Sequence, residues 1–431
     1  MIWNKNVECM PREQMRELQG EKLRRIVAHA YRNSPFYKKR FDEHGVHPDD
    51  IHTIDDIVKL PFTVKQDLRD NYPFGLMAVP MTDIIRLHAS SGTTGKPIVV
   101  GYTQKDLDNW SEAVARCLTA YGLGHDDLIQ ISYGYGLFTG GLGVHAGVQK
   151  IGATVIPTSS GNTQKQIQLM QDFGTTALAC TPSYAMYMAE EINKMGIPKE
   201  RFKLKVGIFG AEPWTNAMRH EIQDKLHLKA FDIYGLTEIS GPGAGGECEC
   251  QNGTHIWEDL FYPEIIDPAT LQPVEPGQKG ELVFTTLDKW GMPMIRYRTR
   301  DLTSLNYDKC DCGRTCVRMG KILGRSDDML IIRGVNIFPS QIETVLMEQG
   351  YPANYQIIVD RVNHSDTLEV LVEMTPDSFS DSLSKITRME QTLVAALKEM
   401  LGIVVKVRLV APKSIERSEG KAVRIIDKRK I

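Results

Sequence analysis

A regular exchange between amphipathic stretches and short apolar runs is the main pattern of this chain between residues 103 and 234. Exchange on this scale predicts units of strand, crossover helix and strand, and therefore a parallel sheet flanked by helices. The expected helices cover residues 103–121, 141–151, 164–173, 182–195 and 216–226. The expected strands cover residues 128–132, 154–157, 177–180, 205–209 and 229–234.

Two further helices are expected nearer the N-terminus, where apolar residues recur among charged ones. The first covers residues 11–33. The second covers residues 63–71, and its Thr63 and Gln66 have the spacing of a capping box. Both helices are expected to be scaffold.

After Gly241 the chain becomes rich in turns and prolines, and its apolar runs become short. This pattern predicts a small antiparallel or barrel-like subdomain. Its expected strands cover residues 261–266, 281–285 and 294–297.

A separate pattern begins beyond Gly324, with apolar runs and helical stretches that would form a compact mixed α/β domain. We therefore expect an α/β protein with a large N-terminal domain, residues 1–326, and a smaller C-terminal domain, residues 327–431. The large domain would hold mixed sheets flanked by helices plus the barrel-like subdomain. The C-terminal elements are expected at residues 329–332, 340–348, 355–359, 368–373, 385–401 and 404–410.

Composition and charge limit the classes of partner. The 431 residues are 42% hydrophobic and 24% charged, which is typical of a globular protein and excludes a largely disordered chain. The net charge of −3 gives no basic excess for nucleic acid or anionic lipid, so we expect a small-molecule partner. No apolar run approaches the length that spans a bilayer, and no secretion signal is recognised, so we expect a cytoplasmic protein.

The segment Ser90-Ser91-Gly92-Thr93-Thr94-Gly95-Lys96-Pro97 is the first with evident chemistry. Its glycines let backbone N–H groups approach an anion, while its hydroxyls and ammonium add donors for phosphate oxygens. It is not a Walker A loop, which needs Gly where Ser90 stands, Ser or Thr where Pro97 stands, and a following helix. The alternative is a polar turn between two strands.

Three more segments carry polar groups suited to a nucleotide. Tyr234, Thr237 and Glu238 follow a predicted strand, at the end where open α/β sheets bind ligands, and could stack on a base, bond phosphate and hold Mg²⁺. Asp301 could accept hydrogen bonds from ribose hydroxyls. Lys421, in a stretch after Pro412, could reach a carboxylate or phosphate as a point charge. Surface turns and a solvated lysine are the alternatives for each segment taken alone.

These segments, in this order and together with residues 324–329 and 333–336, resemble the adenylate-forming enzymes. That family includes acyl-CoA synthetases, luciferases and peptide-synthetase adenylation domains. Within it the chain is similar to the ligases that join aryl-acetic acids to coenzyme A. The similarity covers nearly the whole chain and rests on residues 90–97, 133–141, 210–214, 256–259 and 327–339.

The resemblance implies an AMP-forming acid-thiol ligase that uses ATP, Mg²⁺ and coenzyme A. Lys421, Glu238 and Thr237 would be catalytic, with Glu238 holding Mg²⁺ and Lys421 bridging the acid and the phosphate. The C-terminal domain would be mobile, with a hinge at Asp327 that brings Gly334 to the coenzyme A channel. The resemblance implies that ATP contacts Ser90, Ser91, Gly92, Thr93, Thr94, Gly95, Lys96, Gly210, Ala211, Glu212, Pro213, Asp232, Ile233, Tyr234, Gly235, Thr237, Glu238, Asp301 and Arg325.

The acid pocket would be formed by residues 133–141, in which glycines leave room and aromatic rings could pack against the acid. The alternative is simple packing at the start of a helix. Phenylacetate would be the default acid, although a methylene-sized difference between acids changes binding by only about 1–3 kcal/mol. The candidate pocket residues are Tyr133, Tyr135, Gly136, Phe138 and Gly141.

The eight cysteines are few and unevenly placed, which suits a metal better than disulfides. Cys248 and His255 lie on one segment, and Cys310 and Cys312 form a compact turn on another. Thiolate and imidazole from two close pairs are the ligands of tetrahedral Zn²⁺, so we expect a structural zinc. Cys250 or Cys316 could substitute for one ligand, and unrelated buried thiols are the alternative.

Two rival functions stay open. An adenylating enzyme of the same kind could transfer a different aryl acid to coenzyme A, to a carrier protein or to an amine. A non-catalytic nucleotide sensor is the other, but it predicts loss of the phosphate loop, Glu238 or Lys421, and none is lost. The resemblance also implies a homodimer.

Overall fold

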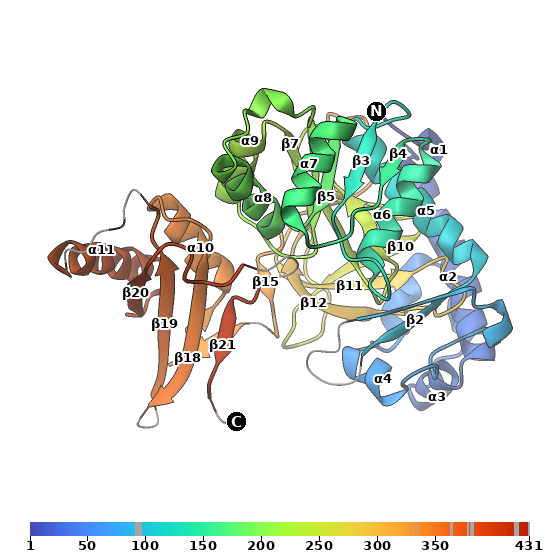
Figure 1. The fold of residues 1–431 in the computed structure, drawn as a ribbon. Helices are drawn as coiled ribbons and strands as arrows, with labels where there is room; N and C mark the ends of the chain where they lie inside the picture. Colours follow the sequence, from blue (N-terminus) through green and yellow to red (C-terminus); the bar gives the residue numbers. More distant parts are fainter. Residues whose placement is uncertain are drawn as a thin grey trace. The chain divides into compact units, whose positions relative to one another are not determined.

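The chain is described by a computed structural model that covers residues 1–90, 97–327, 329–333, 335–362, 365–376, 379, 383–417 and 422–429 (Figure 1). It divides into two compact units. The first unit comprises Met1–Cys180, Glu200–Ala211 and Lys229–Lys321, and the second comprises Thr181–Lys199, Glu212–Leu228 and Ile322–Ile431. None of the described helices is long and apolar enough to cross a membrane.

The first unit is built on a nine-stranded sheet with the order β13-β14-β9-β8-β7-β6-β5-β3-β4. Its strands from β7 to β4 pair in parallel, as the exchange of helical stretches and apolar runs predicts, and the predicted α/β class is confirmed. The parallel strands are β3 (Leu128–Ile131), β4 (Thr154–Ile156), β5 (Ala177–Cys180), β6 (Val206–Gly210) and β7 (Lys229–Leu236). The others are β8 (Gly241–Gly246), β9 (Thr254–Ile256), β13 (Leu305–Asn306) and β14 (Arg318–Met319).

Helices between these strands confirm the predicted stretches to within a few residues. The first of them begins with a capping box, in which the Thr103 hydroxyl accepts from the Asp106 N–H at 3.2 Å and Asp106 accepts from the Thr103 N–H at 2.9 Å. In the first unit they are α5 (Gln104–Ala120), α6 (Thr139–Lys150) and α7 (Thr163–Phe173). In the second they are α8 (Pro182–Lys194) and α9 (Asn216–Leu226).

Strand β8 is a strand that the sequence does not predict, because its residues are almost all Gly and Pro, which are depleted in strands. It pairs antiparallel with both β7 and β9. Gly243 has φ +100°, and a Cβ there would lie 2.6 Å from the side chain of Val114 in α5. The glycines therefore let α5 pack directly on this strand.

The N-terminal segment contains α1 (Lys5–Glu8), α2 (Arg12–Asn33), α3 (Pro35–Glu43), α4 (Lys65–Asp70) and short 3₁₀ turns at Pro48–Asp50, Ile54–Lys59 and Met81–Asp83. The helix predicted at residues 11–33 is confirmed as α2. The expected capping box of Thr63 and Gln66 is wrong. The Val64 N–H donates to Asp67 at 2.8 Å, and the Thr63 hydroxyl instead donates to the Ile295 carbonyl at 2.7 Å, because that tertiary contact competes with the local cap.

The barrel-like subdomain contains β10 (Phe261–Ile266), β11 (Gly280–Thr286) and β12 (Tyr297–Thr303), paired antiparallel in that order. A strand at residues 294–297 is wrong, since β12 begins only at Tyr297. Arg296, just before it, has φ +46°, which an extended strand does not allow. A separate pair of strands, β1 (Arg86–Ala89) and β2 (Val99–Tyr102), is also antiparallel.

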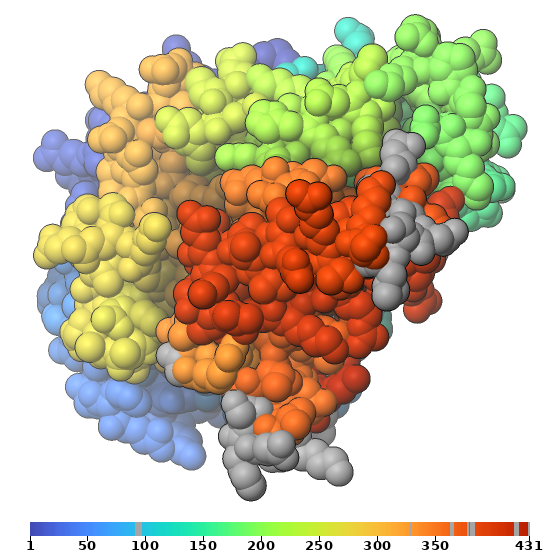
Figure 2. Space-filling model, turned by 90° about the vertical axis from the view of Figure 1, so that its left-hand side faces the viewer, coloured from blue at the N-terminus to red at the C-terminus, as the bar shows by residue number. Residues whose placement is uncertain are grey.

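The second unit contains a sheet with the order β20-β19-β18-β21. Its aliphatic residues, among them Ile357, Val370 and Leu397, form one buried core, and the orange and red residues pack closely in Figure 2. The elements predicted past residue 324 are confirmed. Strands β15, β17 and β21 are also present, and the sequence did not predict them. The elements are β15 (Gly324–Arg325), β16 (Leu330–Ile332), β17 (Val335–Ile337), α10 (Pro339–Glu348), β18 (Tyr355–Val362), β19 (Ser365–Glu373), α11 (Leu383–Leu401), β20 (Lys406–Val410) and β21 (Ile425–Asp427), with a 3₁₀ turn at Lys199–Arg201 in the preceding segment.

Candidate active site

Tyr234 and Asp301 form the centre of the candidate site. Tyr234 lies near the end of β7, and its hydroxyl donates a 2.6 Å hydrogen bond to the Asp301 carboxylate on β12. The two residues were predicted separately, as the adenine contact and the ribose contact. The fold brings them together from strands of two different sheets.

Asp301 stands at an irregular point of β12. The register between β11 and β12 shifts between Glu281 and Val283, and Arg300 takes φ +70° there. Bulges of this kind re-aim side chains and occur often beside active sites. Buried Glu281 pairs with Arg298 at 2.8 Å and Arg300 at 3.5 Å, so the irregular segment is fixed by ion pairs.

Glu238, the predicted Mg²⁺ ligand, is buried in the turn that follows β7. One of its carboxylate oxygens accepts a 3.1 Å hydrogen bond from the Tyr297 hydroxyl. Its backbone carbonyl accepts from the ammonium of Lys289 at 2.9 Å. Glu238 is therefore held through both its side chain and its backbone, as a side chain predicted to bind a cation would need to be.

Lys289 is a buried cation beneath this turn. Its ammonium lies 5.0 Å from the ring centre of Tyr102, and burial lowers the pKa of Lys289 from its ordinary 10.5 to about 8, although Asp106 and Glu238 raise it in part. Burial also raises the pKa of Tyr102 well above its ordinary value. A lysine that can carry a positive charge therefore lies close to Glu238, the predicted Mg²⁺ ligand.

Thr237, predicted to contact the α-phosphate, lies beside the first residue of α6. Its hydroxyl is 3.3 Å from the hydroxyl of Thr139, and the Tyr102 hydroxyl is 3.4 Å from its carbonyl oxygen. Two hydroxyls therefore meet where the turn after β7 approaches the N-terminus of α6, whose backbone N–H groups favour an anion.

The described part of the phosphate loop is its two ends, Ser90 and Pro97. The residues between them lie outside the described residues: Ser91, Gly92, Thr93, Thr94, Gly95 and Lys96. The Ser90 N–H donates to the Ile98 carbonyl at 2.9 Å, and the Ile98 N–H donates to the Ser90 hydroxyl at 3.0 Å. The loop thus connects two antiparallel strands, β1 and β2, and does not open a helix. This connection differs from that of a Walker A loop, as the sequence indicates.

The end of β6 supplies the other predicted adenine contacts. Gly210 pairs with Ile233 in the parallel register of β6 and β7, so these two strands end at one edge of the sheet. Ala211 takes φ +72°, an uncommon conformation for a residue with a side chain, and such outliers gather at binding sites. Pro213 and Ala211 are exposed, while the Asp232 N–H donates to Glu247 at 2.8 Å within the sheet.

The predicted acid pocket begins at the turn before α6. The Gly141 N–H donates to the Gly134 carbonyl at 3.2 Å, and a Cβ at Gly141 would lie 2.8 Å from that oxygen and 2.9 Å from the Tyr135 ring. Only glycine lets this ring lie against the first turn of the helix. The Tyr135 hydroxyl is 3.2 Å from Nδ1 of His145, and burial raises the pKa of Tyr135 to about 12.

The remaining pocket residues differ in exposure. The Tyr133 hydroxyl donates to the Ile208 carbonyl at 3.4 Å within the sheet, and Tyr133 is buried. Phe138 is half exposed, and Gly136 takes φ +96° in the turn between them. The Ala89 N–H of β1 donates to the carbonyl of residue 137 at 2.8 Å, which links this segment to the strand before the phosphate loop.

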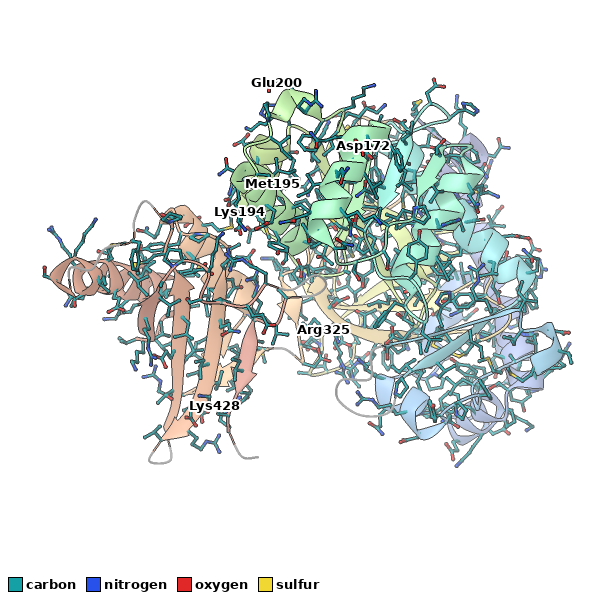
Figure 3. The ribbon with its side chains drawn as sticks, viewed as in Figure 1. Asp172, Lys194, Met195, Glu200, Arg325 and Lys428 are labelled. Carbon is teal, nitrogen blue, oxygen red and sulfur yellow. The ribbon has the colours of Figure 1, made fainter. Side chains whose placement is uncertain are left out.

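The other predicted site residues belong to the second unit. Arg325, labelled in Figure 3, donates from Nε and Nη2 to Asp327 at 2.9 Å each, so the predicted hinge residue is paired. Glu212 accepts from the Ser183 N–H at 2.7 Å. Gly334 and Lys421 lie outside the described residues.

The predicted metal ligands meet in the first unit. The ligand atoms of Cys248, His255, Cys310 and Cys312 all lie within 4.8 Å of one another. Sγ of Cys248 is 3.7 Å from Sγ of Cys310, and Sγ of Cys312 is 3.4 Å from Nε2 of His255. The two suggested substitutes lie elsewhere, because Cys250 is exposed and the Cys316 thiol donates to the Glu8 carbonyl at 3.5 Å.

Sequence reasoning gave no role of their own to four residues of the site, namely Tyr297, Lys289, Thr139 and His145, although Thr139 lies in the predicted pocket segment 133–141. Tyr297 could have been found, because it alternates with Thr299 and Asp301 and therefore shares a strand face with Asp301. No sequence signal marks Lys289, a lone lysine in a loop.

Comparisons with known proteins identify the family of this chain. Residues 18–287 match the AMP-binding enzyme family, and residues 334–429 match the AMP-binding enzyme C-terminal domain. Phenylacetate-coenzyme A ligase of Aromatoleum evansii is 51% identical, covering 98% of this chain and 96% of its own length. The enzyme of that name from Escherichia coli (strain K12) is 50% identical, covering 99% and 97%.

A solved structure gives the same result for the fold. 2-Hydroxyisobutyryl-CoA ligase, in the postadenylation state with 2-HIB-AMP, matches with a TM-score of 0.94 and 30% identity, over 99% of this chain and 92% of that one. Because one family match covers more than half of the chain and its full-length relatives are about half identical to it, the chain belongs to the AMP-binding enzyme family.

Proposed function

We propose that this enzyme uses ATP to join phenylacetate to coenzyme A, through an acyl adenylate, with release of diphosphate and then AMP. Three predicted nucleotide-site residues, Tyr234, Asp301 and Glu238, come together at the end of β7, beside the strands β1 and β2 that the phosphate loop connects. This arrangement is the observation that carries the proposal. Full-length relatives named phenylacetate-coenzyme A ligases support the choice of acid and thiol. A different aryl acid, or transfer to a carrier protein or an amine, is less favoured by those names.

The first half-reaction needs cations at the reacting phosphate. Attack of a carboxylate on the α-phosphate brings like charges together, so positive groups must stand where charge accumulates. Glu238 would hold Mg²⁺ there, with its carboxylate oriented by Tyr297. Thr237 would bond the α-phosphate, and Lys421 would bridge acid and phosphate.

Nucleotide binding follows from the same edge of the sheet. The Asp301 carboxylate would accept from the ribose hydroxyls, and its bond to Tyr234 would keep the tyrosine ring in place for adenine. The backbone at residues 210–213 and 232–235 would border the base. Loop residues 90–96 would contact the β- and γ-phosphates, and Arg325 would assist at the ribose.

The second half-reaction needs access for the thiol of coenzyme A to the acyl carbon. We propose that residues 327–431 act as a mobile domain, that Asp327 is its hinge, and that Gly334 borders the path of the thiol. A loop residue that absorbs a large backbone change is a suitable hinge. Pairing of two copies of the chain stays a prediction from the resemblance.

The acid would enter the segment from Tyr133 to Gly141. Gly141 leaves room beside Tyr135, whose ring offers an apolar face for an aromatic acid. Gly136 would widen the turn, and half-exposed Phe138 would cover the entrance.

The test is to incubate the protein with ATP, Mg²⁺, coenzyme A and a panel of aryl and alkyl acids, and to follow AMP and thioester. We expect phenylacetate to give the highest kcat/KM. A Glu238→Gln variant should lose activity, while Glu249→Gln, a change of the same kind at a solvent-facing carboxylate, should keep it. If no acid gave coenzyme A-dependent thioester, the proposal would be wrong.

We further propose that Cys248, His255, Cys310 and Cys312 hold a structural Zn²⁺. Tetrahedral zinc with Zn–S near 2.3 Å and Zn–N near 2.05 Å sets sulfur atoms about 3.8 Å apart, and sulfur and nitrogen about 3.5 Å apart. The observed 3.7 Å and 3.4 Å separations agree with both values. The donor set therefore fits the ion in chemistry, and these two separations fit it in geometry, with all four ligand atoms within 4.8 Å of one another.

The surroundings of the cluster also fit a metal with three thiolates. Arg314 donates to Sγ of Cys312 at 3.6 Å and pairs with buried Glu8 at 2.6 Å. A guanidinium in this position would offset the negative charge of the thiolates and orient one of them. A bound zinc would join β9 and the turn before it to the turn between β13 and β14, so its role would be structural. Metal analysis of the purified protein should give about one zinc per chain.

A further inference from the structure

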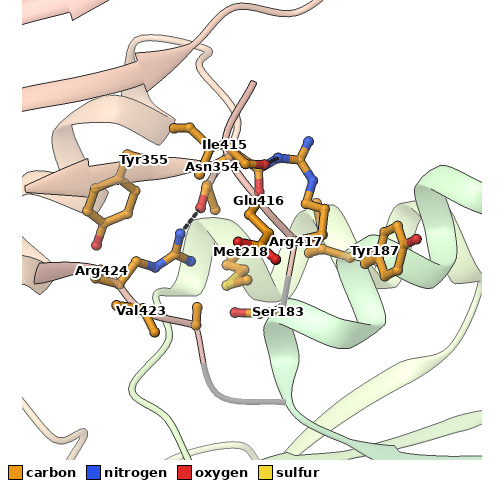
Figure 4. A pocket seen from close by; sticks show the side chains of 13 residues that line it. Ser183, Tyr187, Met218, Asn354, Tyr355, Ile415, Glu416, Arg417, Val423 and Arg424 are labelled. Carbon is orange, nitrogen blue, oxygen red and sulfur yellow. Dashed lines mark hydrogen bonds between the residues drawn. The ribbon is translucent and has the colours of Figure 1, made fainter. Parts of the chain in front are cut away.

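Residues Arg417 and Ala422 flank the segment that contains Lys421, and they contact carboxylates within residues 181–199 and 212–228. All of these residues belong to the second unit. Arg417, Ala422 and Arg424 line one pocket of this unit together with Ser183 and residues near them (Figure 4). The contacts on each side of the segment can therefore be compared directly.

Arg417 is held between two carboxylates. Its Nε and Nη2 each lie 3.4 Å from Oε2 of Glu190 in α8, and its Nη2 donates to Oε1 of Glu373 in β19 at 3.1 Å. Glu190 also accepts from the side-chain amide of Asn354 at 3.3 Å. Glu190 of α8 thus contacts two residues from separate parts of the chain, Arg417 and Asn354.

Ala422 is held through its backbone. Its N–H donates to Oε2 of Glu212 at 3.2 Å, and the other carboxylate oxygen of Glu212 accepts from the Ser183 N–H at 2.7 Å. Ser183 stands in the first turn of α8, where backbone N–H groups need external acceptors. The Glu212 carboxylate therefore bridges the start of α8 and the residue after Lys421.

The chain beyond Ala422 is fixed as well. Arg424 donates to the Ala353 carbonyl, lies over the Tyr355 ring at 4.5 Å, and approaches Glu343 at 3.8 Å. The Ile357 N–H donates to the Arg424 carbonyl at 2.7 Å, at the start of the pairing between β18 and β21. Movement of Ala422 is limited from this side.

We propose that Glu190 and Glu212 are positioning residues for the adenylation step, because they anchor the two flanks of the segment that carries Lys421. The proposal rests on the role of Lys421 given above. Five peptide units join Arg417 to Ala422 and can span at most about 18 Å, so the two anchored residues fix both ends of the short span that includes Lys421. Prior restriction of a reacting group lowers the entropy cost of reaching the transition state.

The two half-reactions separate this role from a merely structural one. Adenylation needs the lysine, whereas attack of coenzyme A on a supplied acyl adenylate needs it less. Loss of an anchor should therefore slow the first step and spare the second. A general loss of folding would lower both.

The main variant is Glu190→Gln, which keeps an acceptor for Asn354 and removes the charge that pairs with Arg417. We expect the rate constant for acid-dependent release of diphosphate, measured in a single turnover without coenzyme A, to fall about tenfold at saturating ATP, with no change in the ATP concentration that gives half of that rate. Thioester formation from purified phenylacetyl adenylate and coenzyme A should stay within about twofold. The conservative Glu190→Asp variant should recover part of the adenylation rate.

Glu191→Gln is the matched control, since Glu191 is the next residue of α8 and pairs with Lys194 at 3.5 Å. It should change neither half-reaction. Arg417→Lys is a second variant that removes the planar contacts of the guanidinium while keeping its charge, and it should show the same split as Glu190→Gln. Glu212→Gln should also lower the adenylation rate.

The outcomes are distinguishable. Equal losses in both half-reactions, or no loss of adenylation in Glu190→Gln and Arg417→Lys, would overturn the positioning role. Absence of any acyl adenylate from the unchanged protein would instead overturn the proposed function. If the wild-type protein formed thioester and the variants formed it at the same rate, the positioning role of Glu190 and Glu212 would be wrong and the proposed function would stand.

Discussion

The hydroxyl of Tyr234 donates a 2.6 Å hydrogen bond to the carboxylate of Asp301, across 67 positions of sequence. This bond links the central parallel sheet to the antiparallel strands of the barrel-like subdomain. Neither segment alone indicates a nucleotide site more strongly than a surface turn. Their contact gives one place where a base and a ribose can be bound together.

Asp301→Asn should weaken ATP binding, because an amide offers one acceptor oxygen where the carboxylate offers two charged ones. Hydrogen bonds to charged groups contribute about 1.5–3 kcal/mol, so KM for ATP should rise about 10- to 100-fold with a smaller change in kcat. Steady-state kinetics with ATP varied will measure this. Asp267→Asn is the control, since Asp267 accepts from the N–H groups of Ala269 and Thr270 in a surface turn, at 2.7 Å and 3.3 Å. Equal KM values for the two variants would remove Asp301 from the ribose site.

Gly141→Ala should impair use of the acid. The added Cβ would lie 2.8 Å from the Gly134 carbonyl and 2.9 Å from the Tyr135 ring, so the ring or the turn must move. We expect a rise of about tenfold or more in KM for phenylacetate, with KM for ATP nearly unchanged. Gly124→Ala is the control, because a Cβ there meets nothing within 4 Å. An unchanged KM for the acid would indicate that the segment serves only helix packing.

Much of this fold follows from the sequence, and the exceptions have local physical causes. The helices and parallel strands between residues 103 and 234 were predictable because their apolar periodicity is set by burial against one sheet. Strand β8 was not predictable, since its glycines give no apolar pattern. They are there because Val114 packs directly on the backbone at Gly243. The cap at Thr63 failed because its hydroxyl is used by the Ile295 carbonyl, 232 positions away.

The site divides in the same way. Tyr234, Glu238 and Asp301 were predicted because their segments occur together and in order, although each segment alone fits a surface turn equally well. Tyr297 and Lys289 contact Glu238, and the contact of Lys289 depends on three-dimensional placement alone. The four candidate metal ligands were predicted by type and spacing, with Cys250 or Cys316 as possible substitutes. The fold brings those four together and leaves the two substitutes elsewhere.

Cys310→Ser should abolish zinc binding, because serine oxygen is a poor ligand in place of a thiolate. We expect the metal content to fall from about one equivalent to near zero and the thermal transition to move down. Cys250→Ser is the control, since Cys250 is exposed and stands outside the cluster. Strong chelators should lower the transition of the wild type but not that of Cys310→Ser. Wild-type protein that is folded and active with less than about half an equivalent of zinc would contradict the site.

Asp259→Ala should destabilise the first unit. Arg116 donates to Asp259 at 2.6 Å and 3.1 Å, and both side chains are buried. Removing Asp259 takes two hydrogen bonds from the buried Arg116 guanidinium and leaves it a 3.3 Å contact with Glu112, so we expect a loss of up to about 3–5 kcal/mol in urea unfolding. Asp55→Ala, which breaks the exposed pair with Arg16, should cost less than about 1 kcal/mol. Similar losses in the two variants would show that the Arg116 guanidinium finds solvent or another partner.

Lys289 should make stability depend on pH in a defined window. Its folded pKa of about 8 lies below the ordinary 10.5, because burial disfavours the charged form. Between these values the unfolded chain holds a proton that the folded chain has released, so stability rises with pH; below pH 8 both states hold it and this gain is absent. Relative to Lys289→Met, which has no such group, wild-type stability should rise by up to about 1.4 kcal/mol per pH unit across the window. Urea unfolding of both proteins between pH 7 and pH 10 will measure the difference. A difference that stays constant, or that falls as pH rises, would show that the lysine keeps an ordinary pKa in the folded protein.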